Sequence, residues 1–554
     1  MSLSMPPVSR ALRVVALSAA LVGALIAGGA PALAQAPCSP TNVTNWCVHE
    51  DLFGVSGFAG EDGHFGGSLA FGDFNGDGFD DLAVGAPGTN DGAGIVLVFY
   101  SNGSMLVLLG QQIFGQTSAG GTADGGAEVG DRFGAALAAG DFDDDGFDDL
   151  AVGSPGETLP ETSPAHCSGV ICEESGGVHV IYGSAAGLDI DGSQFFNAGD
   201  LTGAFGDGPQ DGEHLGETLV VGDFSGAGDG IDDLAVGAPD RFLAAPGKRG
   251  VIYVAFGSAD GMGGGEGGLI LGTTGIEPPC APTFRRLGAA LAVARFEPES
   301  SRELIAGAPL CQLGSTFDTG AVFSYGPPII LSAPTLHLEQ ADYGSAVSEP
   351  GDAFGTTLAV ADFDFDGIDD LAVGAPLKNH GSGTPSDSGV VYVAYGTASG
   401  PDPSVAPDQI GEEEWAGQTP EAGDGFGTAL AAGLLDRDVS ADLLIGNPGQ
   451  GSDGGFVYSK RGSALGLTPA GNRVISQGFI GGATESGDRF GEVLALGDVN
   501  GDGVAEVAIG VPHEDIGTII DAGMVYVTHF FDTAWIFSDG FETGDKSAWS
   551  ASTP

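Results

Sequence analysis

The sequence predicts an all-β protein: a seven-bladed β-propeller of four-stranded antiparallel blades. Three observations support this fold class. One phrase recurs seven times, short β-branched runs follow the copies, and glycine is abundant, with 99 of 554 residues. Copies spaced 64 to 82 residues apart suit propeller blades with generous loops and are too long for solenoid rungs. No segment shows a sustained 3.6-residue periodicity, so we expect very little helix.

Each copy of the phrase predicts the first two strands of one blade. The inner strand is expected over 65–71 in the first copy, where small residues suit the crowded centre, and the second over 82–85. β-branched and aromatic runs, such as 95–100, predict the third strand, and weaker patterns, such as 472–476, predict the outer one. The copies begin at His64, Arg132, His214, Arg286, Ala353, Gly425 and Arg489.

A propeller ring must also close. Residues 48–58 precede the first copy just as an outer strand precedes each later copy. We therefore expect this N-terminal segment to complete blade seven, which joins the two ends of the chain and leaves few open sheet edges.

The N-terminus has the pattern of an export signal. Arg10 and Arg13 precede an apolar stretch over 14–27, and Ala32-Leu33-Ala34 fits a cleavage site. The predicted organisation is a signal peptide over 1–34, a lead over 35–47, the propeller over 48–530 and a C-terminal tail over 531–554, for which a sorting role is a hypothesis. We expect a secreted or cell-surface protein with no transmembrane span in the mature chain.

Charge and cysteine content narrow the partners and the compartment. The chain holds 75 acidic and 17 basic residues, a formal net charge of −58, which repels nucleic acid and anionic membranes. An even number of cysteines in an exported chain favours disulfides. Neighbours in sequence suggest the pairs Cys38/Cys47, Cys167/Cys172 and Cys280/Cys311, although other pairings stay open.

The loop between the first and second strands has a calcium-type pattern. In units one, two, five and seven, side-chain oxygens stand at positions one, three, five and nine, a backbone carbonyl stands at position seven, and glycine stands at position six. Hard oxygen donors at this spacing suit Ca²⁺. An EF-hand is excluded because position twelve, such as Val84, lies in a strand, whereas ion-free Asx turns remain the alternative. The expected ligands are Asp73, Asn75, Asp77, Phe79 and Asp81; Asp141, Asp143, Asp145, Phe147 and Asp149; Asp362, Asp364, Asp366, Ile368 and Asp370; and Asp498, Asn500, Asp502, Val504 and Glu506.

The three other units depart from the pattern. Unit three is two residues longer, and a fifth site there would use Asp223, Ser225, Asp229 and Asp233. Unit six has Leu434 at position one but keeps Asp436, Asp438 and Asp442, which would make a weak site. Unit four has Arg295 at position one, so we expect no ion there.

The alternating phrases resemble FG-GAP repeats, as in Phe65-Gly66 with Gly85-Ala86-Pro87. This family includes integrin α-subunit heads and many exported bacterial proteins, and the resemblance covers about residues 48 to 530. It implies a calcium-binding adhesion or protein-ligand binding module with an extracellular protein or glycan ligand. Basic residues at 241, 248–249 and 285–286 are most simply solvated charges that soften local repulsion, with a surface for an acidic partner as the alternative.

The sequence carries no HExxH, GxSxG or GxxxxGK[ST] motif, so we expect that the chain is not an enzyme. A lectin-like propeller is the alternative function, and a propeller hydrolase or lyase also stays open. No tryptophan recurs from blade to blade, which counts against a repeating sugar site.

Overall fold

The fold is known from a computed structural model of the chain. It describes residues 45–48, 61–107, 110–117, 126–160, 167, 171–202, 208–224, 230–242, 249–263, 268–272, 280, 286–296, 302–314, 316–326, 334–344, 348–379, 386–404, 408–480 and 482–531. The predicted signal peptide and most of the predicted tail lie outside these residues.

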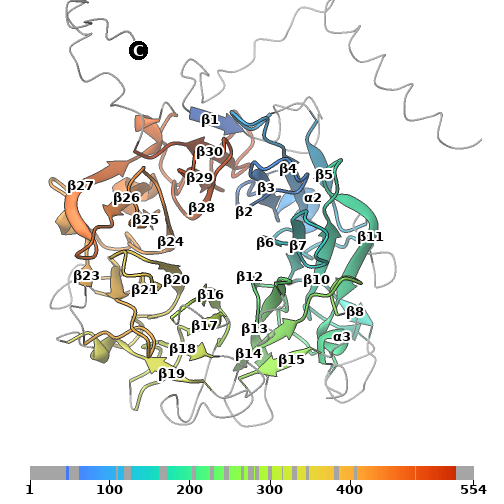
Figure 1. The fold of residues 1–554 in the computed structure, drawn as a ribbon, viewed down its shortest axis with the longest axis horizontal. Coiled ribbons are helices and arrows are strands. Elements are labelled where there is room, and N and C mark those ends of the chain that lie inside the picture. The colour runs from blue at the N-terminus through green and yellow to red at the C-terminus, as the bar shows by residue number, and fades with distance from the viewer. Residues whose placement is uncertain are drawn as a thin grey trace, which may run out of the picture.

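Seven four-stranded antiparallel sheets form a ring around a central axis, which confirms the predicted propeller (Figure 1). Blade one contains β2 (Ser68–Gly72), β3 (Asp81–Ala86), β4 (Ile95–Phe99) and β5 (Gln112–Phe114); blade two contains β6 (Ala136–Gly140), β7 (Asp149–Ser154), β10 (Gly177–Tyr182) and β11 (Asp189–Phe196); blade three contains β12 (Thr218–Gly222), β13 (Asp233–Phe242), β14 (Arg249–Ala255) and β15 (Leu269–Leu271); blade four contains β16 (Ala290–Ala294), β17 (Glu303–Ala308), β18 (Ala321–Tyr325) and β19 (Leu336–Leu338). Blade five contains β20 (Thr357–Ala361), β21 (Asp370–Ala375), β22 (Val390–Ala394) and β23 (Asp408–Ile410); blade six contains β24 (Ala429–Gly433), β25 (Asp442–Asn447), β26 (Phe456–Arg461) and β27 (Thr468–Ile475); blade seven contains β28 (Val493–Gly497), β29 (Glu506–Val511), β30 (Met524–Thr528) and β1 (Asn45–Val48).

The described helices are single turns, as the absence of helical periodicity predicts. They are α2 (Thr89–Gly92), α3 (Ala198–Thr202), α4 (Gln450–Asp453), η5 (Gln340–Asp342), η6 (Glu412–Glu414) and η7 (Gln477–Phe479). A separate two-stranded sheet joins β8 (Leu159–Pro160) to β9 (Ile171–Cys172). Among the described residues, no helix has the length and apolar character needed to cross a membrane.

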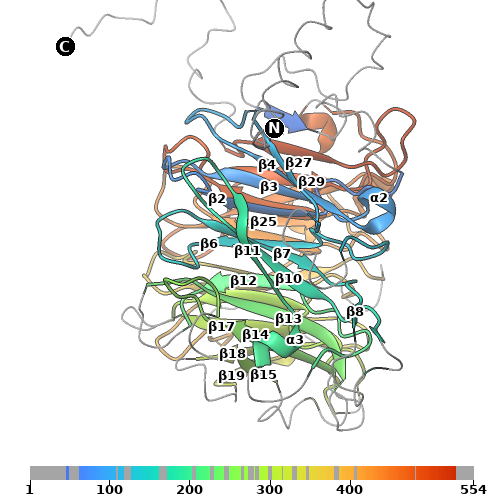
Figure 2. The same cartoon turned by 90° about the vertical axis from the view of Figure 1, so that its right-hand side faces the viewer.

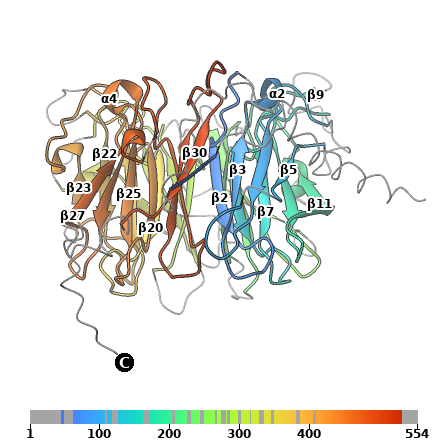
Figure 3. The ribbon, with the colours of Figure 1, turned by 90° about the horizontal axis from the view of Figure 1, so that it is seen from above.

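The connections divide between two faces of the ring. The links between second and third strands, with α2, α4 and β9, lie on one face, which we call the upper face (Figure 3). Figure 2 shows α2 and β8 on the same side of the blades. The acidic loops between first and second strands lie at the opposite end of these strands, on the lower face.

The N-terminal strand closes the ring, as expected, but it lies earlier than predicted. β1 pairs antiparallel with β30, with Asn45 opposite Thr528 and Val48 opposite Val525. Val48 is fully buried in the core between blades seven and one. The charged sequence His49-Glu50-Asp51 begins directly after Val48 and is unsuited to a buried strand. Residues 49–58 of the predicted strand lie outside the described residues.

At each boundary between neighbouring blades, the glycine of one blade's second strand, such as Gly85, contacts the glycine of the next blade's Phe-Gly phrase. A Cβ atom on Gly85 would lie 2.2 Å from the carbonyl oxygen of Gly134, the glycine of the next blade's Phe-Gly phrase. At the last boundary, a Cβ on Gly510 would lie 2.3 Å from the Gly66 oxygen. Gly66 itself has φ of +88°, a conformation that favours glycine. Both glycines of the repeat are therefore needed for neighbouring backbones to touch.

Backbone hydrogen bonds tie neighbouring blades at both ends of this contact. At the upper face, the amides of Arg132 and Phe133 donate to the carbonyls of Gly92 and Ala93 at 2.8 and 3.1 Å. At the lower face, the Asp148 amide donates to the Asp73 carbonyl at 3.1 Å. The Phe-Gly aromatic ring, Phe133, is buried between the blades.

Two predicted disulfides are present. Cys167 bonds to Cys172 and Cys280 bonds to Cys311, with Cα–Cα distances of 5.0 and 5.4 Å. Cys47 is also disulfide-bonded. Its predicted partner, Cys38, lies outside the described residues.

Val48→Asp tests the closing strand. We expect it to lower the free energy of unfolding by about 3 kcal/mol or more, because it places an unpaired carboxylate in the core between the first and last blades. Val129→Asp is the matched control, since that side chain is 78% exposed. Urea unfolding of both variants measures the difference, and equal, small effects would show that β1 does not hold the ring closed.

Candidate functional site

The acidic loop of blade two shows how the sequence builds the candidate site. This loop joins the end of β6 to the start of β7. The carboxylate of Asp141 accepts the amides of Asp145 and Gly146 at 3.1 and 3.0 Å, and Asp145 accepts the amide of Phe147 at 3.0 Å. Glycine at position six has φ of +89° and lets the chain turn around the first aspartate.

The same three hydrogen bonds recur in the other loops with the full pattern. They form between the equivalent residues of blades one, five and seven, with distances of 2.8 to 3.1 Å. Positions one, five and seven are thus set by local backbone geometry. Four copies of one loop conformation follow from four copies of one sequence pattern.

In two of the loops the structure brings three predicted ligands together. One oxygen each of Asp141, Asp143 and Asp149 lies within 4.8 Å of the others, and Asp362, Asp364 and Asp370 converge in the same way. Oδ1 of Asp143 is buried and has no hydrogen-bond partner among the described residues. Hard carboxylate oxygens around one point, one of them buried and unsatisfied, fit a bound Ca²⁺.

The acid at position nine is the most buried member of each loop. The two oxygens of Asp149 accept backbone amides from different parts of the blade, from Phe142 at 2.9 Å and from Gly183 at 2.8 Å, whereas one oxygen of Glu506 lies 2.8 Å from Nδ1 of His529. Burial raises the pKa of Asp149 and Asp81 to about 8 and that of Asp370 to about 7. A nearby cation would oppose this shift, because it favours the charged form of a carboxyl group.

Asparagine replaces aspartate at position three of blades one and seven. Nδ2 of Asn75 donates to Asp81 at 3.1 Å, and Nδ2 of Asn500 donates to Glu506 at 2.6 Å. The amide nitrogen therefore contacts the acid at position nine. Turning the amide by half a rotation would present its oxygen to the centre of the loop instead.

The loops that depart from the pattern differ in the described structure. In blade six, the guanidinium of Arg461 pairs with Asp436 and lies 3.6 Å from Asp438. A side-chain cation thus contacts two of the three acids of the predicted weak site, Asp436 and Asp438. In blade four, the Arg295 amide donates to Asp369 of the next blade at 2.7 Å, as the amide at position one also does in blades one, two and seven.

The predicted fifth site in blade three is only partly described. Asp223 accepts the amide of Gly230 at 3.3 Å, and Asp233 accepts the amides of Phe224 and Gly257 at 2.7 and 3.0 Å. Ser225 and Asp229 lie outside the described residues, so their part in this site stays a prediction.

Sequence reasoning missed the acid at position eight, which links blades. Asp148 of blade two accepts the amide of Asp73 of blade one at 2.8 Å, while its own amide donates to the Asp73 carbonyl. Asp80 accepts the Asp498 amide at 2.7 Å across the last boundary. The sequence did contain a pattern that indicates this acid. The phrase GFDDLAVG has two adjacent acids, and only the second was assigned a role.

A cavity of about 540 Å³ lies beside the altered loop of blade six. Arg437, Arg461 and Arg473 line it together with Phe531. The guanidiniums of Arg461 and Arg473 lie 5.1 and 5.4 Å from the centre of the Phe531 ring, and Arg473 donates to the Phe530 carbonyl at 3.0 Å. Arg461 pairs with Asp436, which also lines the cavity, and Arg437 lies 3.2 Å from Asp502, so two of the three guanidinium groups already contact acids.

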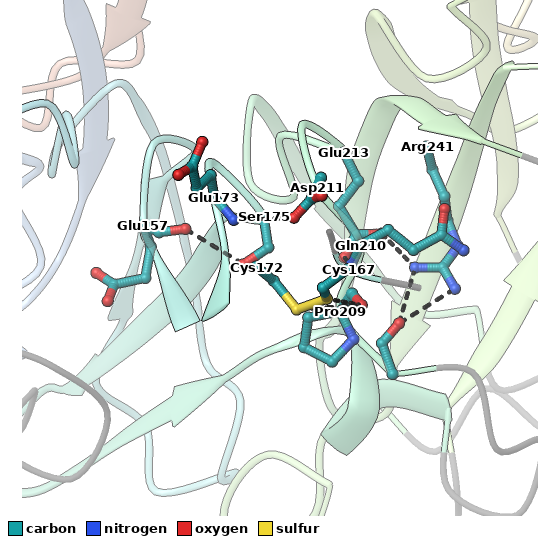
Figure 4. Close-up of a disulfide and its surroundings, with 11 residues drawn as sticks. Glu157, Cys167, Cys172, Glu173, Ser175, Pro209, Gln210, Asp211, Glu213 and Arg241 are labelled. Atoms are coloured by element: carbon teal, nitrogen blue, oxygen red, sulfur yellow. Dashed lines mark hydrogen bonds and ion pairs between the residues drawn. A yellow bond between two sulfur atoms is a disulfide. The ribbon is translucent and has the colours of Figure 1, made fainter. Parts of the chain in front are cut away.

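The proposed basic surface near residue 241 has a different role. Arg241 is 1% exposed and pairs with buried Glu213, close to the Cys167–Cys172 disulfide (Figure 4). Its guanidinium also lies 5.6 Å from the centre of the Tyr253 ring. Arg241 is therefore neither a solvated surface charge nor a receptor for an acidic partner, because it is buried and an internal carboxylate takes its charge. Lys248 and Arg285 lie outside the described residues.

Comparison with known proteins identifies the repeats. Residues 65–99, 133–166, 354–393 and 490–528 match the family model described as FG-GAP repeat. The chain is 27% identical over 450 residues to phosphatidylinositol-glycan-specific phospholipase D of Homo sapiens, which covers 76% of this chain and 48% of that protein. It is 30% identical over 183 residues to integrin alpha-4 of Xenopus laevis (33% of this chain, 16% of that protein) and 31% identical over 202 residues to integrin alpha-PS2 of Drosophila melanogaster (36% and 12%).

The match to the phospholipase contradicts the expectation that the chain is not an enzyme. That expectation relied on the absence of local motifs, whereas a relative aligned over most of this chain bears the name of an enzyme. A catalytic site assembled from separated residues leaves no such motif. The chain spans about half the length of this human relative.

Asp148→Ala tests the link between blades. We expect the free energy of unfolding to fall by about 1.5–3 kcal/mol, because a hydrogen bond to a carboxylate is lost from a partly buried boundary. Exposed Asp260→Ala is the control and should change it by less than about 0.5 kcal/mol. Unfolding in chelator measures the link without any contribution from metal. An unchanged midpoint for Asp148→Ala would contradict the role of position eight.

Proposed function

We propose that this FG-GAP repeat propeller, similar to integrin α subunits and to phosphatidylinositol-glycan-specific phospholipase D, is an extracellular ligand-binding module stabilised by calcium. The observation that carries the proposal is the convergence of three carboxylates in the loops of blades two and five. The similarity to integrin α chains supports a role in adhesion or protein-ligand binding.

The metal part of the proposal follows from charge. Two carboxylates about 4 Å apart repel each other by about 4 kcal/mol at an effective dielectric constant of about 20. Asp141, Asp143 and Asp149 lie within such range of one another and a Ca²⁺ ion would turn their repulsion into attraction. In blade six, position one is Leu434, and Arg461 supplies positive charge to Asp436 and Asp438, so the repulsion between acids is relieved there by a side chain.

In the proposed role, calcium sets stability rather than chemistry. At free calcium about tenfold above its dissociation constant, each site would add about 1.4 kcal/mol to the folded state. Four sites would add about 6 kcal/mol, which is comparable to the whole margin of a typical domain. The lower face would hold the ions, which leaves the loops of the upper face available for ligand contacts.

Asp366→Asn and Asp438→Asn test the calcium loops as a matched pair. Both residues hold position five, and each accepts the amide two residues later, at 2.9 and 3.1 Å. Calcium should raise the melting temperature of the unchanged chain strongly. Asp366→Asn should remove about 1.4 kcal/mol of the calcium-dependent gain in stability. Asp438→Asn should remove none, because the guanidinium of Arg461 already supplies positive charge to the loop of blade six.

Thermal unfolding in calcium and in chelator measures both variants. A melting curve that does not respond to chelator would contradict the calcium assignment. Equal losses in the two variants would contradict the distinction between blades five and six.

Whether the chain binds a protein or a glycan is tested by a separate binding measurement. The immobilised chain should retain extracellular proteins in calcium and release them in chelator, whereas a lectin-like propeller would give a discrete pattern on a glycan array. Binding that is the same in calcium and chelator would contradict a calcium-stabilised recognition surface.

A second candidate function is hydrolysis of a phosphatidylinositol-glycan. The match to the phospholipase over 76% of the chain favours it, and so does the position of Arg473 in the lining of the blade-six cavity, because a guanidinium group binds phosphate with two parallel hydrogen bonds. Under this candidate, Arg473 contacts the phosphate of the substrate. Its guanidinium faces the cavity beside Phe531.

An anchored reporter protein on lipid vesicles tests the second candidate. The chain should release the reporter, and Arg473→Gln should lower the rate by about tenfold or more, as expected for the loss of a charged hydrogen bond. Arg132→Gln, an exposed position on the upper face, is the control and should keep the full rate. No release by the unchanged chain would rule this candidate out.

A further inference from the structure

Two histidines and an aspartate meet where the last blade joins the first. His64 directly precedes the Phe-Gly phrase of blade one, and His513 and Asp521 lie in the connection between β29 and β30 of blade seven. All three are on the upper face, at the opposite end of the strands from the acidic loops. The chain has nine histidines, so a pair at one boundary is uncommon.

The backbone fixes these residues relative to one another. The amides of Asp62, His64 and Phe65 donate to the carbonyls of Ile520, Asp521 and Ala522 at 3.0, 3.1 and 3.0 Å. The Gly523 amide donates to the Glu514 carbonyl at 3.0 Å, which holds the connection as a closed loop. The three side chains therefore project from a hydrogen-bonded scaffold.

Their polar atoms converge on one point. One nitrogen of each imidazole and one oxygen of Asp521 lie within 4.8 Å of one another. Nδ1 of His513 lies 3.2 Å from Oδ1 of Asp521, and its Nε2 lies 3.6 Å from Oε2 of Glu492. The side chains of His513 and Asp521 are 30% and 31% exposed, so an ion can reach them from solvent.

We propose that His64, His513 and Asp521 form a binding site for a zinc-class divalent ion, with Glu492 beside it. Two imidazole nitrogens and one carboxylate oxygen are a donor set that suits zinc, which takes four ligands and accepts water as the fourth. Calcium prefers oxygen ligands alone, so this site would be chemically distinct from the acidic loops.

A similar cluster at another boundary shows what the proposal requires. His214, Glu217 and Asp240 also place polar atoms within 4.8 Å of one another. There, however, the guanidinium of Arg286 pairs with Glu217 and lies 3.8 Å from Asp240. Arg286 occupies the repeat position that His64 holds in blade one. At the closing boundary an imidazole holds this position, and the guanidinium of Arg489 pairs with Glu492, at 2.9 Å, beside the cluster.

The site would add a bond across the boundary that closes the ring. His64 belongs to blade one, whereas His513 and Asp521 belong to blade seven, so one ion would connect the two. Binding should therefore raise stability as well as produce a metal signal.

Cobalt and zinc binding to the mature chain, in saturating calcium, tests the proposal. Co²⁺ should give the visible absorption bands of a site with nitrogen ligands, and calorimetry should detect one tight zinc site. His64→Ala and His513→Ala should each weaken zinc binding by about 100-fold or more, since even a residue that only supports a ligand costs about 10–100-fold. His214→Ala is the matched control and should leave the affinity unchanged.

The variants are chosen so that loss of folding cannot explain the result. His64 has φ of 54°, and alanine already stands at the same repeat position in blade five, where Ala353 has φ of 55°. Zinc should also raise the melting temperature of the unchanged chain and of His214→Ala, but not that of His64→Ala. Zinc affinity that survives both His64→Ala and His513→Ala, or falls equally in His214→Ala, would overturn the proposal.

Discussion

Neighbouring blades approach so closely at one point that only backbone fits between them. The glycine of one blade's second phrase faces the carbonyl of the next blade's Phe-Gly glycine, and a single Cβ there would lie about 2 Å from that oxygen, as at Gly153 against Gly216 at 2.1 Å. The contact repeats from blade one to blade seven and then back to Gly66. Because the approach is fixed, both positions must be glycine, and the residue before the Phe-Gly glycine, such as Phe133, is buried between the blades.

The acidic loops are placed by this same contact. It sets the inner strands, and each inner strand leads directly into a loop on the lower face. The acid at position eight then ties its loop to the preceding blade, as Asp148 does with Asp73. Where alanine holds that position, at Ala441 and Ala505, the backbone bond remains and the side-chain bond is lost. Blade packing and loop geometry are therefore parts of one arrangement.

The sequence predicted the fold well because the signal was periodic and local. Seven copies set seven blades, and the loop hydrogen bonds followed from spacing within nine residues. Three features depended on contacts between distant segments and were missed or misplaced. The closing strand was predicted too late in the sequence, because its partner β30 is more than 400 residues away; the observed strand begins at Asn45. The side chain of Arg241 turns inward to Glu213, and that of Arg461, the last residue of β26, contacts Asp436 in the loop between β24 and β25. The similarity to a protein named as a phospholipase was missed for a similar reason, since no local motif in the sequence reports it.

The position of β1 has a mechanical consequence. Asn45 lies opposite Thr528, so the chain enters and leaves the described propeller at the same end of one antiparallel pair. Tension applied through the two flanking segments would load the hydrogen bonds between β1 and β30 one after another, in an unzipping geometry. A shear geometry would load them all together. The ring would then open first at blade seven under modest force, while the glycine contacts between the other blades carried little of the load.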